Sequence, residues 1–199
     1  MTAKEGRIHG TDRLKAIVVE SNSVKSAMLE KCSLSFDQIA SAFITSLGQG
    51  NKVLLCGNGG SASDAQHVAS ELVGRFQRNR RGLPAIALTT DGAMMTSISN
   101  DFGYEKVFSR QVEALAEEGD IVVGISTSGA SASILQAMKS ARMCGAVTVG
   151  MTGQSGGKLK DVTDFCLCVP STNTARIQEA HITIWHALCE IVEETLFSG

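Results

Sequence analysis

The sequence has little proline, few aromatic residues and no excess of charge of either sign. Two prolines among 199 residues, with no low-complexity tract, argue against a linker between separate domains. The formal net charge of −2 at pH 7 gives no broad basic surface, so the composition does not favour nucleic-acid binding. With 43% hydrophobic residues, the chain is expected to form one domain, residues 1–199, that buries a sizeable core.

The sequence also lacks long apolar runs. No stretch of about 18 apolar residues is present to span a membrane, and the polar first ten residues lack the apolar region of a signal peptide. We therefore expect a cytoplasmic protein with no membrane partner.

Six cysteines are present, but no C-x-x-C pair. They lie in apolar segments, which indicates buried, reduced thiols without a catalytic role. Cys166 and Cys168 would share one face of a strand, where neighbouring cysteines are poorly placed for a disulfide.

The amino-terminal part of the chain predicts two helices ahead of the first strand. Apolar residues recur at helical spacing over about residues 11–31. A second helix is predicted to begin near Ser35, because Ser35 and Gln38 have the spacing of an N-terminal capping box. Gly48 or Gly50 would end it.

Short apolar strands then alternate with helical runs. The predicted strands are 52–56, 84–89, 121–126, 146–151 and 165–169. The predicted helices are 61–76, 91–98, 104–116, 131–143 and 174–197. Apolar strands separated by helices indicate a five-stranded parallel sheet covered on both faces, a three-layer α/β/α sandwich. Residues 51–199 are expected to form this core, and residues 1–50 a helical segment for oligomerisation.

A glycine turn follows the first predicted strand and leads into a helix. The turn is Gly57-Asn58-Gly59-Gly60, and the helix is expected to begin at Ser61. Glycines allow close backbone approach, and a helix start offers unpaired N–H groups, so the stretch predicts an anion site, most plausibly for phosphate. The turn does not match the dinucleotide or P-loop spacing, and an ordinary loop remains the alternative.

A second polar loop follows the third predicted strand. In the flavodoxin-like strand order 2-1-3-4-5, the ligand crevice lies between strands one and three. Hydroxyl groups stay neutral and donate well to phosphate. A single serine here would be an ordinary helix cap. Four hydroxyls within six residues are more than capping requires, and they belong to Ser126, Thr127, Ser128 and Ser131.

The helices that begin after the glycine turn and near residue 174 carry candidate chemical groups. His67 and Glu71 are four residues apart, so they share one helix face and could transfer protons or bind a metal. Such a pair is also common on solvent-exposed helix surfaces. A histidine in the apolar closing helix is more often a hydrogen-bonded core residue. Gln178 and His186 lie about 80° apart on an ideal helix, so spacing alone does not select His186.

Several blocks, in order, resemble the sugar isomerase (SIS) superfamily and, within it, the phosphoheptose isomerases. They lie between about residues 47 and 197 and read CGNGGSASDAQHVASELVGRF, RGLPAIALTTD, SISNDFGYEKVFSRQVEAL, GDIVVGISTSGASASI and ARIQEAHITIWHALCEIVE. The resemblance implies isomerisation of sedoheptulose 7-phosphate to D-glycero-D-manno-heptose 7-phosphate. It also implies a role in heptose supply for cell-surface polysaccharide such as lipopolysaccharide, and a homotetramer whose sites are shared between subunits.

The resemblance assigns roles by position. The phosphate-binding hydroxyls would be Ser61, Ser126, Thr127, Ser128 and Ser131, beside Gly59 and Gly60. The sugar would meet Asn58, Arg75, Asp101 and Gln178, some of them from a neighbouring subunit. One zinc ion per subunit would be held by His67, Glu71, Gln178 and His186. Glu71 would be the base and His186 its partner. Some members have Asp at the position of Ala175, so a sugar contact here would come from Thr174 or elsewhere.

Two other functions stay open. Relatives on this fold bind the bacterial replication initiator and lack catalysis, having lost residues at the metal and acid/base positions. All four of those residues are present here, which favours an enzyme. A sugar-phosphate sensor, or an isomerase for another ketose phosphate, is the second alternative, because the loops specify a phosphate and not the length of the sugar.

Overall fold

The computed structural model describes residues 10–198. The helices are α1 (Gly10–Gly48), α2 (Gly60–Val73), α3 (Gly92–Phe102), α4 (Ser109–Leu115), α5 (Ala132–Met143) and α6 (Thr174–Leu196), with 3-10 turns η1 (Tyr104–Lys106) and η2 (Gly157–Leu159). The strands are β1 (Val53–Gly57), β2 (Ala85–Ala87), β3 (Ile121–Ile125), β4 (Val147–Thr152) and β5 (Phe165–Cys168). These elements confirm the five predicted strands, although β2 is shorter than predicted.

The five strands form one parallel sheet in the order β2-β1-β3-β4-β5, as predicted. β1 pairs with β3 along its full length, from Val53 beside Ile121 to Gly57 beside Ile125. Both strands are buried throughout because helices cover both faces of the sheet. Their carboxyl ends therefore lie together at one edge, where the two polar loops begin.

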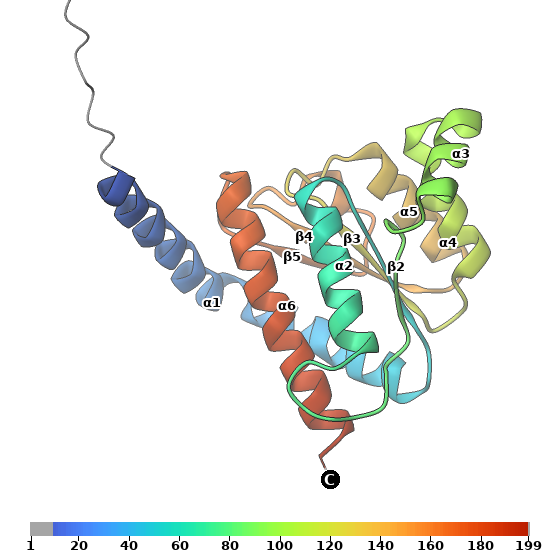
Figure 1. Ribbon diagram of the computed structural model, residues 1–199, viewed down its shortest axis with the longest axis horizontal. Helices are drawn as coiled ribbons and strands as arrows, with labels where there is room; N and C mark the ends of the chain where they lie inside the picture. The colour runs from blue at the N-terminus through green and yellow to red at the C-terminus, as the bar shows by residue number, and fades with distance from the viewer. Residues whose placement is uncertain (1–9, 199) are drawn as a thin grey trace, which may run out of the picture.

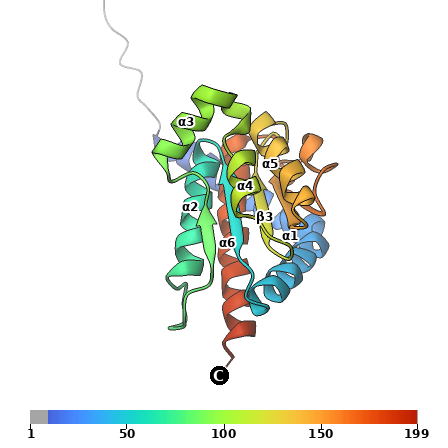
Figure 2. The same cartoon turned by 90° about the vertical axis from the view of Figure 1, so that its right-hand side faces the viewer.

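The layers are α1, α2 and α6 on one face of the sheet and α4 and α5 on the other (Figure 1). Figure 2 shows α4 and α5 in front of the sheet and α1 and α6 behind it. Trp185 of α6 is fully buried in the first layer, with its ring 6.2 Å from the ring of Phe43 on α1. This packing fixes the rotation of α6 relative to the sheet.

The prediction of two amino-terminal helices is wrong, because α1 is a single helix through Gly48. The Ser35 hydroxyl does not cap a new helix; it donates to the carbonyl of Cys32 within the same helix, at 2.9 Å. A capping motif marks a start only where the preceding chain leaves the helix, and no glycine or proline between residues 11 and 47 forces it to do so. The predicted end is confirmed, since Gly50 follows with φ 88°.

Two other helix boundaries differ from prediction. Helix α3 continues to Phe102, four residues beyond the predicted end. The predicted helix over 104–116 divides into η1 and α4, with Val107 and Phe108 between them. Among residues 10–198, no helix has both the length and the apolar character needed to cross a membrane.

Candidate active site

Helices α2 and α6 lie side by side and both begin at the edge where the parallel strands end (Figure 1). Each helix follows a strand of the sheet, so its first turn faces the polar loops. Its later turns carry side chains away from them at about 1.5 Å per residue. Groups at matching heights on the two helices are thereby brought together.

Glu71 lies between two histidines. Its Oε1 atom is 3.1 Å from Nε2 of His67 and 3.5 Å from Nε2 of His186. The two imidazole rings are 5.3 Å apart and meet edge to face. The Glu71 side chain is 13% exposed, whereas the imidazoles are nearly half exposed, so solvent or a ligand can reach the group from one side.

These three side chains fit a divalent metal ion. One donor atom from each lies within 4.8 Å of the others, and two imidazole nitrogens with a carboxylate oxygen are ligands that zinc accepts. The second carboxylate oxygen of Glu71 is buried, and the carboxylate interacts with the thiol of Cys189 on α6. The family resemblance implied these three residues as metal ligands, whereas helix spacing alone had not selected His186.

Gln178, the fourth predicted ligand, lies at the other end of the same helix pair. A Cβ atom on Gly60 would come within 2.5 Å of its side-chain nitrogen, so the carboxamide rests against the start of α2. Gln178 lines a hollow with the polar loops. Its metal ligation stays a prediction.

The polar loops enclose this hollow of about 250 Å³ at the carboxyl ends of β1 and β3. The lining residues are Asn58, Ser61, Ile125, Ser126, Thr127, Ser128, Ser131, Thr174 and Gln178. Seven of the predicted substrate residues therefore lie together in this hollow. Six come from the two polar loops and the start of α2, and the seventh is Gln178 of α6. Thr174 is part of the wall, as expected for a residue that would replace a contact missing at Ala175.

Asn58 ties the two loops together. Its side-chain amide donates to the hydroxyls of Ser131 and Ser133, at 2.9 and 3.1 Å. Its amide oxygen accepts from the hydroxyl of Tyr104 at 2.7 Å. Sequence reasoning missed Tyr104 and Ser133, because only the folded chain brings the 3-10 turn η1 and the first turn of α5 against the glycine loop.

Two of the three helices that begin at the hollow, α2 and α5, have uncapped starts. No side chain caps α2 at Gly59 or α5 at Ser131. By contrast, Asp91 caps α3 and Asn173 caps α6 through side-chain oxygens that accept from backbone N–H groups. Helix-start N–H groups without a side-chain cap carry partial positive charge and suit an anion such as phosphate.

Arg75 and Asp101 do not line the hollow. Both side chains are exposed, and the Asp101 carboxylate accepts from the Asn100 amide at 2.9 Å. Gly59 and Gly60 contribute backbone at the start of α2 and are not among the lining residues either. The predicted contacts of Arg75 and Asp101 with the sugar, some of them from a neighbouring subunit, stay predictions.

His181 is a core residue, which is the usual case for a histidine in an apolar helix, whereas His186 is not. It is fully buried, and its Nε2 atom donates to the carbonyl of Thr152 at 3.2 Å. Burial lowers the pKa of the imidazole to about 4, although the hydrogen bond opposes this shift. The side chain is therefore neutral at pH 7 and takes no part in the site.

Asp64 is a carboxylate on α2, three residues before His67. Burial raises the pKa of its carboxyl group, and the nearby His67 partly offsets the shift. One oxygen, Oδ2, is buried without a hydrogen-bond partner.

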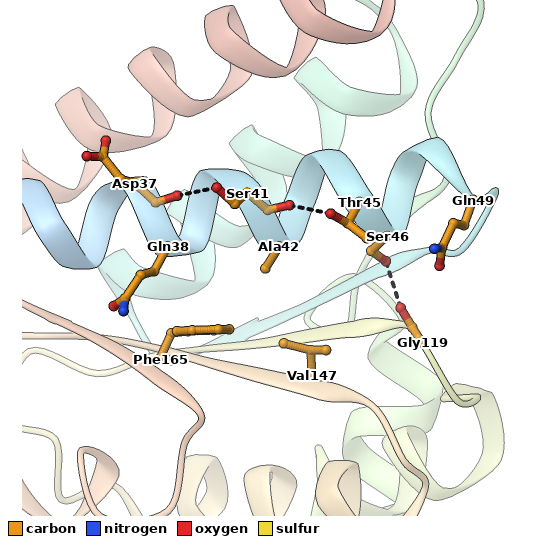
Figure 3. Close-up of a pocket in the computed structure, with 10 residues that line it drawn as sticks. All are labelled: Asp37, Gln38, Ser41, Ala42, Thr45, Ser46, Gln49, Gly119, Val147 and Phe165. Carbon is orange, nitrogen blue, oxygen red and sulfur yellow. Dashed lines mark hydrogen bonds between the residues drawn. The ribbon is translucent and has the colours of Figure 1, made fainter.

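A larger hollow of about 560 Å³ lies at the opposite end of the sheet (Figure 3). Val147 and Phe165, which begin β4 and β5, form an apolar floor beneath α1. The hydroxyls of Ser41 and Thr45 donate to carbonyls of their own helix, and that of Ser46 donates to Gly119. Its hydroxyls are thus already paired, so size alone does not make this hollow a catalytic site.

Residues 18–153 match the SIS domain family. The chain is 60% identical to the phosphoheptose isomerase of Roseiflexus sp. (strain RS-1) over 177 residues, which cover 89% of this chain and 90% of that protein. A solved phosphoheptose isomerase from Francisella tularensis superposes with a TM-score of 0.90 at 39% identity, over 94% of this chain and all of that one. The enzyme from Neisseria gonorrhoeae gives 0.88 at 41% identity, over 92% and 98%.

The fold and the polar loops at the strand ends define a SIS domain. At this level of identity over nearly the whole chain, the protein belongs to the phosphoheptose isomerases within that family.

Proposed function

We propose that this protein interconverts sedoheptulose 7-phosphate and D-glycero-D-manno-heptose 7-phosphate through an enediol, in the supply of heptose precursors. One observation carries the proposal. The Glu71 carboxylate lies between two imidazoles on helices α2 and α6. The hydroxyl-lined hollow that we assign as the anion site lies at the amino-terminal ends of the same two helices. An aldose-ketose isomerase needs these two parts, one to anchor the phosphate and the other to move protons beside the carbonyl.

The proton chemistry follows from Glu71 and His186. Moving a carbonyl from C2 to C1 requires removing a proton from C1, passing through an enediol and returning a proton to C2. In this assignment Glu71 takes and returns the carbon-bound proton, while the His186 imidazole exchanges a proton with the sugar oxygens. A carboxylate and an imidazole suit this work near neutral pH.

The spacing along α2 favours a long sugar. Ser61 and Glu71 are ten residues apart, which is about 15 Å along a helix, and the Glu71 side chain leans back toward the helix start. A phosphate at the loops and a carbonyl at Glu71 must therefore belong to an extended chain. Seven carbons meet this requirement better than five.

Zinc is the expected metal, held by His67, Glu71 and His186 with Gln178 as the fourth candidate. When bound, the ion would polarise the carbonyl and stabilise negative charge on the enediolate oxygen. Glu71 would bind the ion less tightly while it acts as the base.

The working form is proposed to be a homotetramer with sites shared between subunits. Arg75 and Asp101 are exposed and outside the hollow, which is consistent with a role on a neighbouring subunit's sugar. Exposed apolar side chains gather on α1, and they belong to Leu14, Val18, Val19, Leu29 and Leu34. An assembly that buries this helix would explain them.

The test is an assay of the purified protein with five-, six- and seven-carbon ketose phosphates, with and without a chelator. We expect turnover of the seven-carbon substrate alone, its loss on chelation and its recovery with Zn²⁺. Turnover that survives thorough chelation would count against zinc. Binding of sugar phosphates without turnover would favour the sensor, and binding of an initiator protein without isomerisation would favour the non-catalytic relative.

A further inference from the structure

Beyond the proton-transfer groups, a buried ion pair joins the ends of the two site helices. Nε of Arg80 lies 2.8 Å from Oε1 of Glu193, and both side chains are at most 2% exposed. Arg80 lies in the loop after α2, and Glu193 is in the last turns of α6. No role in substrate or metal binding was predicted for either residue.

Arg80 holds the carboxyl-terminal turn of α2. Its guanidinium donates to the backbone carbonyl of Glu71 at 2.9 Å and to that of Leu72 at 2.8 Å. The last carbonyls of a helix have no partner within the helix, and a cation there also complements the helix dipole. The backbone that carries the proposed base is thus fixed by the planar fork of one arginine.

Glu193 holds the loop itself. Its carboxylate accepts from three consecutive backbone N–H groups, those of Phe76, Gln77 and Arg78, each at 2.8 Å. This arrangement determines where Phe76 lies. The Phe76 ring stacks on the His186 imidazole, with centroids 5.5 Å apart and planes inclined by 22°.

Glu193 and His186 are seven residues apart on α6, so they lie on the same helix face, separated by two turns or about 10 Å. One carboxylate therefore connects to both halves of the proton-transfer pair. Through Arg80 it reaches the backbone of Glu71, and through Phe76 it reaches the ring of His186.

We infer that Arg80 and Glu193 are positioning residues, which set the separation of Glu71 and His186 and the orientation of the His186 ring. The inference rests on the proposed function. A buried ion pair contributes little to net stability compared with apolar residues of similar volume, so its connection to both active groups gives it a use that packing alone would not. Misplacing such groups by about 1 Å can cost about a hundred-fold in rate.

The experiment compares Glu193→Gln with Glu194→Gln. Glu194 is the next residue on α6 and also pairs with the loop, through Arg78 at 3.6 Å, but both of those side chains are about half exposed. With sedoheptulose 7-phosphate, we expect Glu193→Gln to lower kcat at least about ten-fold with KM changed less than about two-fold. Glu194→Gln should match the wild type. A folded Glu193→Gln protein with wild-type kcat would overturn the inference.

Two further variants cover a failure to fold. Phe76→Leu removes the ring on His186 and keeps an apolar side chain against the core, and Arg80→Lys keeps the charge but loses the fork on the α2 carbonyls. If Glu193→Gln does not fold, the kcat values of Phe76→Leu and Arg80→Lys test the inference instead. Wild-type kcat in both variants would overturn it. Partial loss of kcat in each, with a shifted pH–rate profile for Phe76→Leu, would support it.

A readout without turnover separates this inference from the proposed function. Binding of Zn²⁺ to the metal-free protein, measured by calorimetry, should weaken about ten-fold in Glu193→Gln and not in Glu194→Gln. If the wild type fails to isomerise any ketose phosphate, the proposed function fails. The Zn²⁺ affinities then still decide whether the ion pair positions Glu71 and His186, and equal affinities would refute it.

Discussion

Oε1 of Glu71 lies 3.5 Å from Nε2 of His186, although one residue is on α2 and the other on the last helix of the chain. A second imidazole, that of His67, contacts the same oxygen. The arrangement depends on α2 and α6 running side by side in the same direction.

Replacing Glu71 by Gln removes the proposed base while preserving the shape of the side chain. We expect kcat to fall about 10²- to 10⁴-fold, the usual contribution of a positioned acid or base. KM should change little, because the anion site is untouched. Glu118→Gln, an exposed carboxylate beyond α4, is the control. Unchanged isomerisation of sedoheptulose 7-phosphate by Glu71→Gln would rule out the assigned mechanism.

Replacing Ser128 by Ala removes one hydroxyl from the anion site. Since a hydrogen bond to a charged group contributes about 1.5–3 kcal/mol, KM should rise at least about ten-fold. The change in kcat should be small, because Ser128 is at the phosphate end. Ser140→Ala is a matched control on α5, where the hydroxyl donates to Glu113 at 3.0 Å. Equal KM values for the two variants would contradict a phosphate contact at Ser128.

His181 should make the fold acid-sensitive. Burial lowers its pKa to about 4, against about 6.5 in an unfolded chain. Between these values the unfolded chain binds a proton that the folded chain does not, so stability falls as pH falls from about 6.5 to about 4. His181→Gln should unfold with a shallower pH dependence over this range, measured by urea denaturation. An identical slope would show that another group is responsible.

Cys168 should be the most reactive of the partly exposed thiols. The hydrogen bond from the Cys166 thiol, 3.8 Å away, lowers the pKa of Cys168 to about 6, and the Thr152 hydroxyl and Lys160 act in the same direction against burial. Because the thiolate is the nucleophile, iodoacetamide at pH 7 should alkylate Cys168 before Cys166, whose pKa is raised. Peptide mass spectrometry measures the order. Prior alkylation of Cys144 or Cys166 would contradict it.

The sheet and the anion site could be predicted because their signals are local. An apolar strand followed by Gly57-Asn58-Gly59-Gly60, and another followed by Ser126-Thr127-Ser128, indicate two parallel strands with polar loops. Parallel sheets place such loops at one edge, and the flavodoxin-like strand order expected for this pattern puts these two strands side by side. The S-x-x-Q capping box at Ser35 gave a wrong prediction of a second helix, because a local motif does not distinguish a helix start from a helix interior.

The sequence by itself determined the succession of strands and helices along the chain after residue 52, the two polar loops and the His67–Glu71 pair. Each of these depends on residues a few positions apart. Only the tertiary structure decided that His186 joins that pair while His181 is buried in the core. The difference is the rotation of α6, which the packing of Trp185 fixes. Tertiary packing also placed Arg80 and Glu193 together, because a buried charge pair leaves no periodic signal in the chain.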